Sequence, residues 1–241
     1  QMCIRDRYEA KPKLIEVKKV ITGNYIGYNE FISSVYSLIN DSARVTVNYF
    51  IYENGLVKVS YTLTVKPGLP NIPKIGMQMG IDSSFKQIEY FGRGPLENYI
   101  DRRYGTDVGI YNQNIFDFME PYVVPQENGN RTDVRWMYLH NKTSKDGLLV
   151  VADSLLSMSA WPYTEENIQN ARHTNKLKDA GFITLNIDLI QMGVGGNDSW
   201  SEVAAPLEQY QIKPGSYQYS FYLVPYNAKK KSAGERAKEI K

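Results

Sequence analysis

The sequence predicts an all-β protein, a large antiparallel β-sandwich, from three observations. Apolar and polar side chains alternate from Arg44 to Val65 on both sides of Asn54-Gly55, which is the strongest short-range signal of a β-hairpin. Similar alternating runs follow one another along the chain, and a single short segment has a helical pattern. Strands do not alternate with helices, so a parallel α/β fold is not expected.

The individual elements follow from local patterns. In the hairpin, Asn54 and Gly55 would both have positive φ in a type I′ turn, which these residue types tolerate. A helix is expected at Thr164–Ala171, because Thr164 can cap it and Glu165 and Glu166 lie in its first turn. The other expected strands are Leu14–Ile21, Phe31–Ile39, Lys74–Ile81, Phe85–Phe91, Thr132–His140, Leu148–Ala152, Leu155–Ala160, Gly181–Leu189 and Ser216–Val224.

Composition excludes several classes of function. The 241 residues include 28 Lys and Arg and 26 Asp and Glu, so the net charge is +2. A nucleic-acid binder would need a concentrated excess of basic residues, which this balance does not provide. The sequence also contains no run of roughly 18 apolar residues, the length that a membrane-spanning helix needs. One Cys and two His leave almost no ligands for zinc, so we expect no metal site in this chain.

The two ends of the chain differ from its body. Residues 1–7, QMCIRDR, show neither strand alternation nor a helical stripe, and we expect them to be a non-native leader. The β-sandwich domain is expected over residues 8–227. The basic tail, residues 228–241, is expected to be frayed or weakly helical.

Three long connections, Gly92–Gly105, Glu120–Arg131 and Gln191–Pro206, are rich in Gly, Pro, Asn and charge. Loops of this length are functional or pack against a partner. We interpret their charged side chains as ion pairs that pin the loops, rather than as a catalytic carboxylate pair. The carboxylates are Glu97, Asp101, Glu127, Asp133 and Asp198, and the arginines are Arg93, Arg102, Arg103, Arg131 and Arg135.

Two other patterns have simple interpretations. An aldose epimerase needs a histidine acid and a carboxylate base facing one sugar, and His140 and His173 are the two histidines that could serve in such a site. A partly buried or capping histidine is the simpler interpretation. The run Gly193–Gly196 lacks the spacing of a dinucleotide fingerprint and opens no apolar helix, so we expect no cofactor in this chain.

Trp200 closes the Gly-rich loop, whereas Trp136 and Trp161 lie in or at the end of expected strands and should be core residues. A Trp at a loop tip is either a packing lid or an exposed plate that binds the apolar face of a sugar. The residues alone leave both interpretations open.

Three motifs, in this order, resemble those of large β-galactosidases of glycoside hydrolase family 2. Phe91–Arg102 (FGRGPLENYIDR) is similar to their GRGPxENYxDR segment, and Pro121–Arg131 (PYVVPQENGNR) to their PYxxPQENGNR segment. Met192–Trp200 (MGVGGNDSW) is similar to their MGxGG(D/N)DSW loop. The resemblance runs from about Tyr8 to Tyr226 and extends to the small chain of two-subunit β-galactosidases.

This resemblance implies a galactose-mutarotase-like supersandwich, which would be N-terminally truncated because the match begins inside the domain. It implies that Trp200 stacks on the substrate and that Asp198 and Ser199 belong to the same substrate-binding loop. It implies no catalytic residue in this chain, since the catalytic carboxylates of the family belong to an upstream TIM barrel. We therefore expect the chain alone to be inactive.

The implied partners are a β-galactoside such as lactose and the upstream barrel domain or large subunit. Mg and Na would belong to the complete enzyme. Two alternatives stay open, namely a free-standing carbohydrate-binding module or small subunit, and an aldose-epimerase-like enzyme. The compartment is left open between the cytoplasm and the periplasm of a bacterium.

Overall fold

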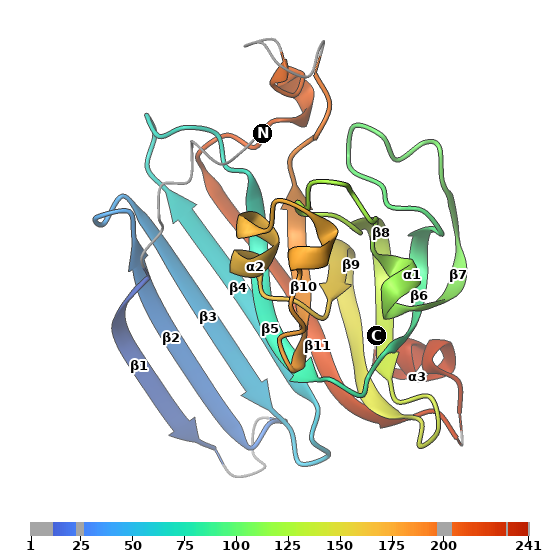
Figure 1. The fold of residues 1–241 in the computed structure, drawn as a ribbon. Helices are drawn as coiled ribbons and strands as arrows, with labels where there is room; N and C mark the ends of the chain where they lie inside the picture. The colour runs from blue at the N-terminus through green and yellow to red at the C-terminus, as the bar shows by residue number, and fades with distance from the viewer. Residues whose placement is uncertain (1–11, 23–26, 197–203, 230, 241) are drawn as a thin grey trace.

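The computed structural model describes residues 12–22, 27–196, 204–229 and 231–240. Antiparallel strands dominate this part of the chain (Figure 1). The strands are β1 (Lys13–Ile21), β2 (Glu30–Leu38), β3 (Ala43–Ile51), β4 (Val57–Val65), β5 (Lys74–Asp82), β6 (Gln87–Gly94), β7 (Asp107–Asn114), β8 (Arg131–His140), β9 (Asp146–Trp161), β10 (Phe182–Gln191) and β11 (Ser216–Asn227). The helices are α1 (Ile115–Phe118), α2 (Glu165–Asn170) and α3 (Ala233–Ile240), with short 3-10 turns at Thr174–Lys176 and Glu208–Tyr210.

The longest of the described helices, α3, has eight residues, so none of the helices in the described ranges could cross a bilayer. Residues 1–7, the expected leader, lie outside the described residues.

Strand β9 connects the two parts of the sheet. The strand order is β1-β2-β3-β4-β11-β9-β8-β6-β7, and β10 joins β9 to β5. The first part of β9, from Asp146 to Ala152, pairs with β11, and the last part, from Ser157 to Trp161, pairs with β10. Between them, Asp153–Leu155 are exposed and the register with β8 shifts, as at a β-bulge. The two strands expected at Leu148–Ala152 and Leu155–Ala160 are therefore halves of one bent strand.

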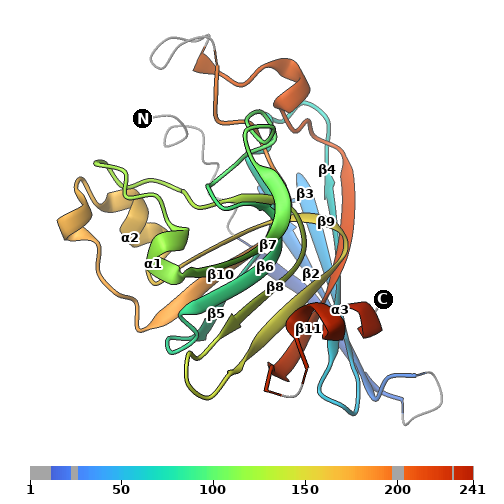
Figure 2. The ribbon, with the colours of Figure 1, turned by 90° about the vertical axis from the view of Figure 1, so that its right-hand side faces the viewer.

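The bend folds the sheet over itself, so that β5 and β10 lie over the inner face of β4 and β11 (Figures 1 and 2). Buried apolar side chains of β3, β4, β5, β9, β10 and β11 form one core between these layers. The Tyr219 hydroxyl of β11 donates to the Ile187 carbonyl of β10 across this core at 2.9 Å. The antiparallel sandwich that the alternation predicts is confirmed.

The β3–β4 hairpin is confirmed, but its predicted turn type is wrong. Only Gly55 has positive φ, at 79°, and Asn54 does not. The Gly55 amide donates to the Tyr52 carbonyl at 3.0 Å, and the Tyr52 amide donates to the Leu56 carbonyl at 2.9 Å. These bonds enclose a three-residue loop, in which a type I turn precedes a left-handed glycine. Because Asn54 Oδ1 accepts from the Leu56 amide at 3.1 Å, Asn54 serves as a local acceptor.

The structure has a helix at the expected position, α2, and another in the basic tail, α3. The N-cap of α2 is confirmed, since Thr164 Oγ1 accepts from the Asn167 amide at 3.0 Å. In the tail, which was expected to be frayed or weakly helical, Ala233–Ile240 form the helix α3. Ser232 and Glu235 cap this helix reciprocally, with amide-to-side-chain distances of 2.9 and 3.2 Å. Buried Ala233 then packs the helix into a cluster with Trp136, so capping and packing act together.

Strand β7 was not expected from the sequence. It lies at the edge of the sheet, paired with β6 alone in the strand order. Its apolar residues Val108 and Ile110 are 42% and 58% exposed. An edge strand with a weak apolar face carries little alternation, and its pairing with β6 decides its conformation.

Candidate functional site

Asn98 ties the first two long loops together. Its backbone amide donates to the Asn130 carbonyl at 2.8 Å, and the Asn130 side-chain amide donates back to the Asn98 carbonyl at 2.8 Å. The Asn98 Oδ1 atom also accepts from the Thr132 amide at 2.9 Å. Both asparagines are buried. Their hydrogen bonds satisfy backbone N–H and C=O groups of irregular segments that are buried away from water.

Glu97 is the second link between these loops. One carboxylate oxygen accepts from the Gly129 amide at 2.8 Å. The other accepts from the Arg102 guanidinium and the Tyr122 hydroxyl. The Glu97 side chain is 5% exposed, so these donors replace its hydration. The prediction that loop carboxylates form pinning ion pairs is confirmed for Glu97.

The same prediction is confirmed for Asp133. Arg93 Nε lies 2.6 Å from one Asp133 oxygen, and Arg103 lies 3.4 Å from the other. Arg93 also donates to the Thr106 carbonyl at 2.7 Å, so it closes the first loop onto its own far end. Arg135 donates to the Asp133 backbone carbonyl at 2.7 Å.

Arg131 has a different role from the one predicted. Its guanidinium is buried and donates to the carbonyls of Gly129 at 3.0 Å and Phe118 at 3.2 Å, and to the Tyr90 hydroxyl at 3.2 Å. It also stacks 4.2 Å above the Phe118 ring. Burial lowers the pKa of Arg131. Backbone carbonyls and aromatic rings, rather than a carboxylate, therefore accommodate this cation.

The prediction of a pinning ion pair is confirmed for Glu127 too, but its partner is Lys74 rather than an arginine, in a partly buried charge cluster that sequence reasoning missed. Lys74 Nζ lies 3.0 Å from Glu127 Oε1. Burial alone would lower the Lys74 pKa, but the carboxylates of Asp188 and Glu127 raise it. Asp188 is 1% exposed, and burial raises its pKa to about 8, against the opposing effect of Lys74. The sequence carried no signal of this burial, because Asp188 continues the polar positions Thr184 and Asn186 of the alternating strand that becomes β10.

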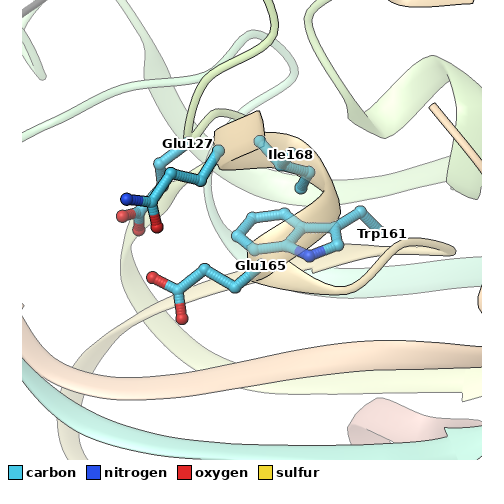
Figure 3. A pocket seen from close by; sticks show the side chains of 5 residues that line it. Glu127, Trp161, Glu165 and Ile168 are labelled. Atoms are coloured by element: carbon cyan, nitrogen blue, oxygen red, sulfur yellow. The ribbon is translucent and has the colours of Figure 1, made fainter. Parts of the chain in front are cut away.

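A small cavity adjoins this cluster. Its volume is about 40 Å³, and Glu127, Trp161, Glu165, Ile168 and Gln169 line it (Figure 3). Figure 3 shows the carboxylates of Glu127 and Glu165 on the same side of the Trp161 ring. Ligand pockets usually measure about 300–1,000 Å³, so this cavity suits water rather than a sugar ring. Trp161 and Trp136 are buried, which confirms both as core residues.

The third loop is held by Asp101. Its Oδ2 atom accepts from the amides of Val194 at 2.8 Å and Gly195 at 2.7 Å. Asp101 thus joins the FGRGPLENYIDR motif to the MGVGGNDSW motif. The predicted substrate-binding residues Asp198, Ser199 and Trp200 lie outside the described residues, and their roles stay predictions.

Among the described residues, the contacts of the two histidines include no carboxylate. His140 is buried, stacks on Tyr138 at 4.7 Å and contacts the Asn141 carbonyl at 2.9 Å. Burial lowers its pKa, and the nearby Lys145 has the same effect. His173 is exposed and precedes a 3-10 turn without a side-chain capping bond. In the described ranges, no three His, Cys, Asp or Glu side chains group as a metal ion would need.

Comparisons with known proteins indicate one family for this chain. A model of the β-galactosidase small chain matches residues 6–223. A β-galactosidase of Priestia megaterium is 33% identical over 210 residues, which cover 87% of this chain and 20% of the relative. One of Streptococcus thermophilus is 31% identical over 186 residues, covering 76% and 18%. A galactose mutarotase related enzyme of Lactobacillus acidophilus has a TM-score of 0.43 and 10% identity, covering 90% of this chain and 73% of that one.

The fold is thus an antiparallel β-sandwich, with one group of linked loops between its strands. The chain belongs to the β-galactosidase small-chain family. It spans about a fifth of the length of the curated relatives it matches.

Proposed function

We propose that this chain is the small-chain domain of a β-galactosidase that hydrolyses terminal β-D-galactosides such as lactose. In this proposal the domain forms part of the active-site wall, and the catalytic carboxylates lie in another domain. The observation that carries it is the loop cluster, in which Glu97, Asn98 and Asp101 fix three irregular segments against one another. Such a rigid support is what a binding loop needs for a defined geometry.

The state of the described carboxylates supports an external catalytic centre. Glu97 and Asp133 are committed to arginines, and Glu127 to Lys74. Glycoside hydrolysis needs an acid and a nucleophile or base on either side of a bound sugar. The cavity beside Glu127 is too small for that sugar. We therefore expect the chain alone to leave a chromogenic β-galactoside uncleaved, in preparations freed of host enzyme.

The resemblance implies Mg²⁺ and Na⁺ in the complete enzyme. We assign both ions to other domains of the complete enzyme. No step of the proposed function depends on them in this chain.

The exposed strand β1 favours a part of a larger protein over a free-standing module. All nine residues of β1 are exposed. Leu14, Val17 and Ile21 are 52%, 54% and 72% exposed. These three lie opposite Tyr36, Ser34 and Glu30 of β2. Ser34 in turn lies opposite the core residue Val47 of β3, so the three apolar side chains of β1 lie on the same face of the sheet as the core. An apolar sheet face of this kind marks an interaction surface, and we assign it to the remainder of the enzyme.

Substrate contact in this proposal belongs to Trp200, with Asp198 and Ser199 in the same loop. A Trp plate buries the apolar face of a sugar and has only two side-chain torsions to order. Its contribution should be about 1–2 kcal/mol, or about tenfold in affinity.

The experiment compares Trp200→Ala and Trp200→Phe in the complete enzyme, with KM for a β-galactoside and thermal melting measured together. Ala should raise KM about tenfold and Phe less, with little change in melting. The matched control is Trp136→Phe, which should lower the melting temperature and leave KM unchanged because Trp136 is buried. A Trp200→Ala enzyme that melts early but binds normally when folded would make Trp200 a packing lid.

A further inference from the structure

We propose that Asp101 is a positioning residue for substrate binding, which acts by holding the stem of the loop that contains Trp200. This inference rests on the proposed function, because it assigns Asp101 an effect on the galactoside only through that loop. It gives the FGRGPLENYIDR motif a defined task, separate from the chemistry of hydrolysis.

The contact itself is a clamp of two amides on one oxygen. Asp101 Oδ2 accepts from Val194 N at 2.8 Å and from Gly195 N at 2.7 Å. Hydrogen bonds to an ionised carboxylate are roughly twice as strong as neutral ones. The other oxygen, Oδ1, is buried and has no hydrogen-bond partner among the described residues. All the described hydrogen bonds of this carboxylate therefore go to Val194 and Gly195 in the loop stem.

The glycines of the stem are required by close packing. A Cβ at Gly193 would lie 2.8 Å from Asp101 Oδ2 and 2.9 Å from Tyr210 Cβ. A Cβ at Gly196 would lie 2.3 Å from the backbone carbonyl atoms of Ala204. None of the stem glycines has positive φ, so their value is the absence of a side chain. The backbones at the two ends of segment 197–203 thus lie directly against each other.

Asp101 is itself held by the rigid part of the loop cluster. It lies four residues after Glu97, whose carboxylate binds the second loop at Gly129. Between them, Tyr99 is 2% exposed, and its carbonyl accepts from the Arg102 amide at 3.0 Å. A fixed turn therefore presents Asp101 to the stem. Positions of this kind set the geometry of a binding residue without touching the ligand.

The test uses the complete enzyme with Asp101→Ala, Asp101→Asn, Trp200→Ala and the double variant Asp101→Ala/Trp200→Ala. Asp101→Ala should raise KM for a β-galactoside about tenfold, because it removes two charge-assisted bonds that order the stem. Asp101→Asn should restore most of the affinity, because its amide oxygen can still accept both bonds. The matched control is Asp107→Ala, since Asp107 is exposed on β7, and it should leave KM unchanged.

The double variant separates positioning from a purely structural role. If Asp101 acts through Trp200, the double variant should have the same KM as Trp200→Ala, because the second change has nothing left to misplace. Additive effects, or a lower melting temperature with an unchanged KM for Asp101→Ala, would overturn the positioning role and leave the proposed function standing. A Trp200→Ala enzyme with normal KM would overturn the proposed function, and this inference with it.

Discussion

Replacement of Glu97 should destabilise the protein far more than the same replacement of Glu208, although each makes one ion pair. The Glu97 side chain is 5% exposed and accepts from a backbone amide, a guanidinium and a hydroxyl. The Glu208 side chain is 79% exposed and pairs with Lys213 alone among the described residues. Sequence context does not distinguish the two, since both lie in polar connections.

The expected magnitude follows from the donors left behind. Removing one partner of a buried ion pair costs about 3–5 kcal/mol. The Arg102 side chain is 47% exposed, so water can rehydrate it, whereas the Gly129 amide would lose its acceptor. We expect about 3 kcal/mol for Glu97→Ala and about 1–2 kcal/mol for Glu97→Gln, which retains an amide oxygen. Glu208→Gln should have no measurable effect.

Urea unfolding of the variants, followed by tryptophan fluorescence and by circular dichroism, measures these differences as shifts of the midpoint at constant slope. Amide hydrogen exchange at Gly129 provides a local readout, which Glu97→Gln should accelerate. Equal midpoints for Glu97→Gln and Glu208→Gln, with unchanged exchange at Gly129, would refute the view that the loop cluster depends on Glu97.

Two further predictions concern the hairpin and the buried acid. Gly55→Val should lower the free energy of unfolding by about 1–2 kcal/mol in chemical melts, and Gly55→Asn should lower it less. The reason is the backbone φ of +79°, since a Cβ there would meet only Pro225, at 3.9 Å. An unchanged midpoint for Gly55→Val would contradict the turn assignment. Because folding raises the Asp188 pKa from 3.8 to about 8, the folded state keeps a proton that the unfolded chain loses, so stability should fall as pH rises through that window. Asp188→Asn cannot ionise and should flatten that pH dependence in melts from pH 4 to pH 9, whereas an unaltered slope would show that Asp188 is not the group responsible.

Local patterns in the sequence determined much of this architecture. Side chains repeat with the period of a strand, so alternation was enough to locate the β3–β4 hairpin and most other strands. The Thr164 cap and the burial of Trp136 and Trp161 follow from position within an element, and both are confirmed. The three loop motifs were also sufficient to indicate the family, since they are long and occur in order.

The loop network was predictable only in kind. Opposite charges in neighbouring loops indicated pinning ion pairs, and Glu97 and Asp133 make them. The partners themselves were not predictable, since Glu127 binds Lys74 rather than an arginine and Arg131 binds carbonyls rather than a carboxylate. The sequence does not show which charged side chains will lie close together. Each partner is decided by the donors and acceptors that the fold brings within reach.

Tertiary structure alone decided which distant residues meet. Asp101 and Val194 are 93 positions apart, and their contact depends on the bend of β9, which carries β10 and the loop after it into place. The surroundings of Asp188 have the same origin, because the charged groups that act on it, Lys74, Glu127 and Glu165, come from segments far apart in the sequence. The period of a strand shows on which face of the sheet a side chain lies. Which segment packs against that face depends on contacts between residues far apart in the sequence, and local patterns do not encode those contacts.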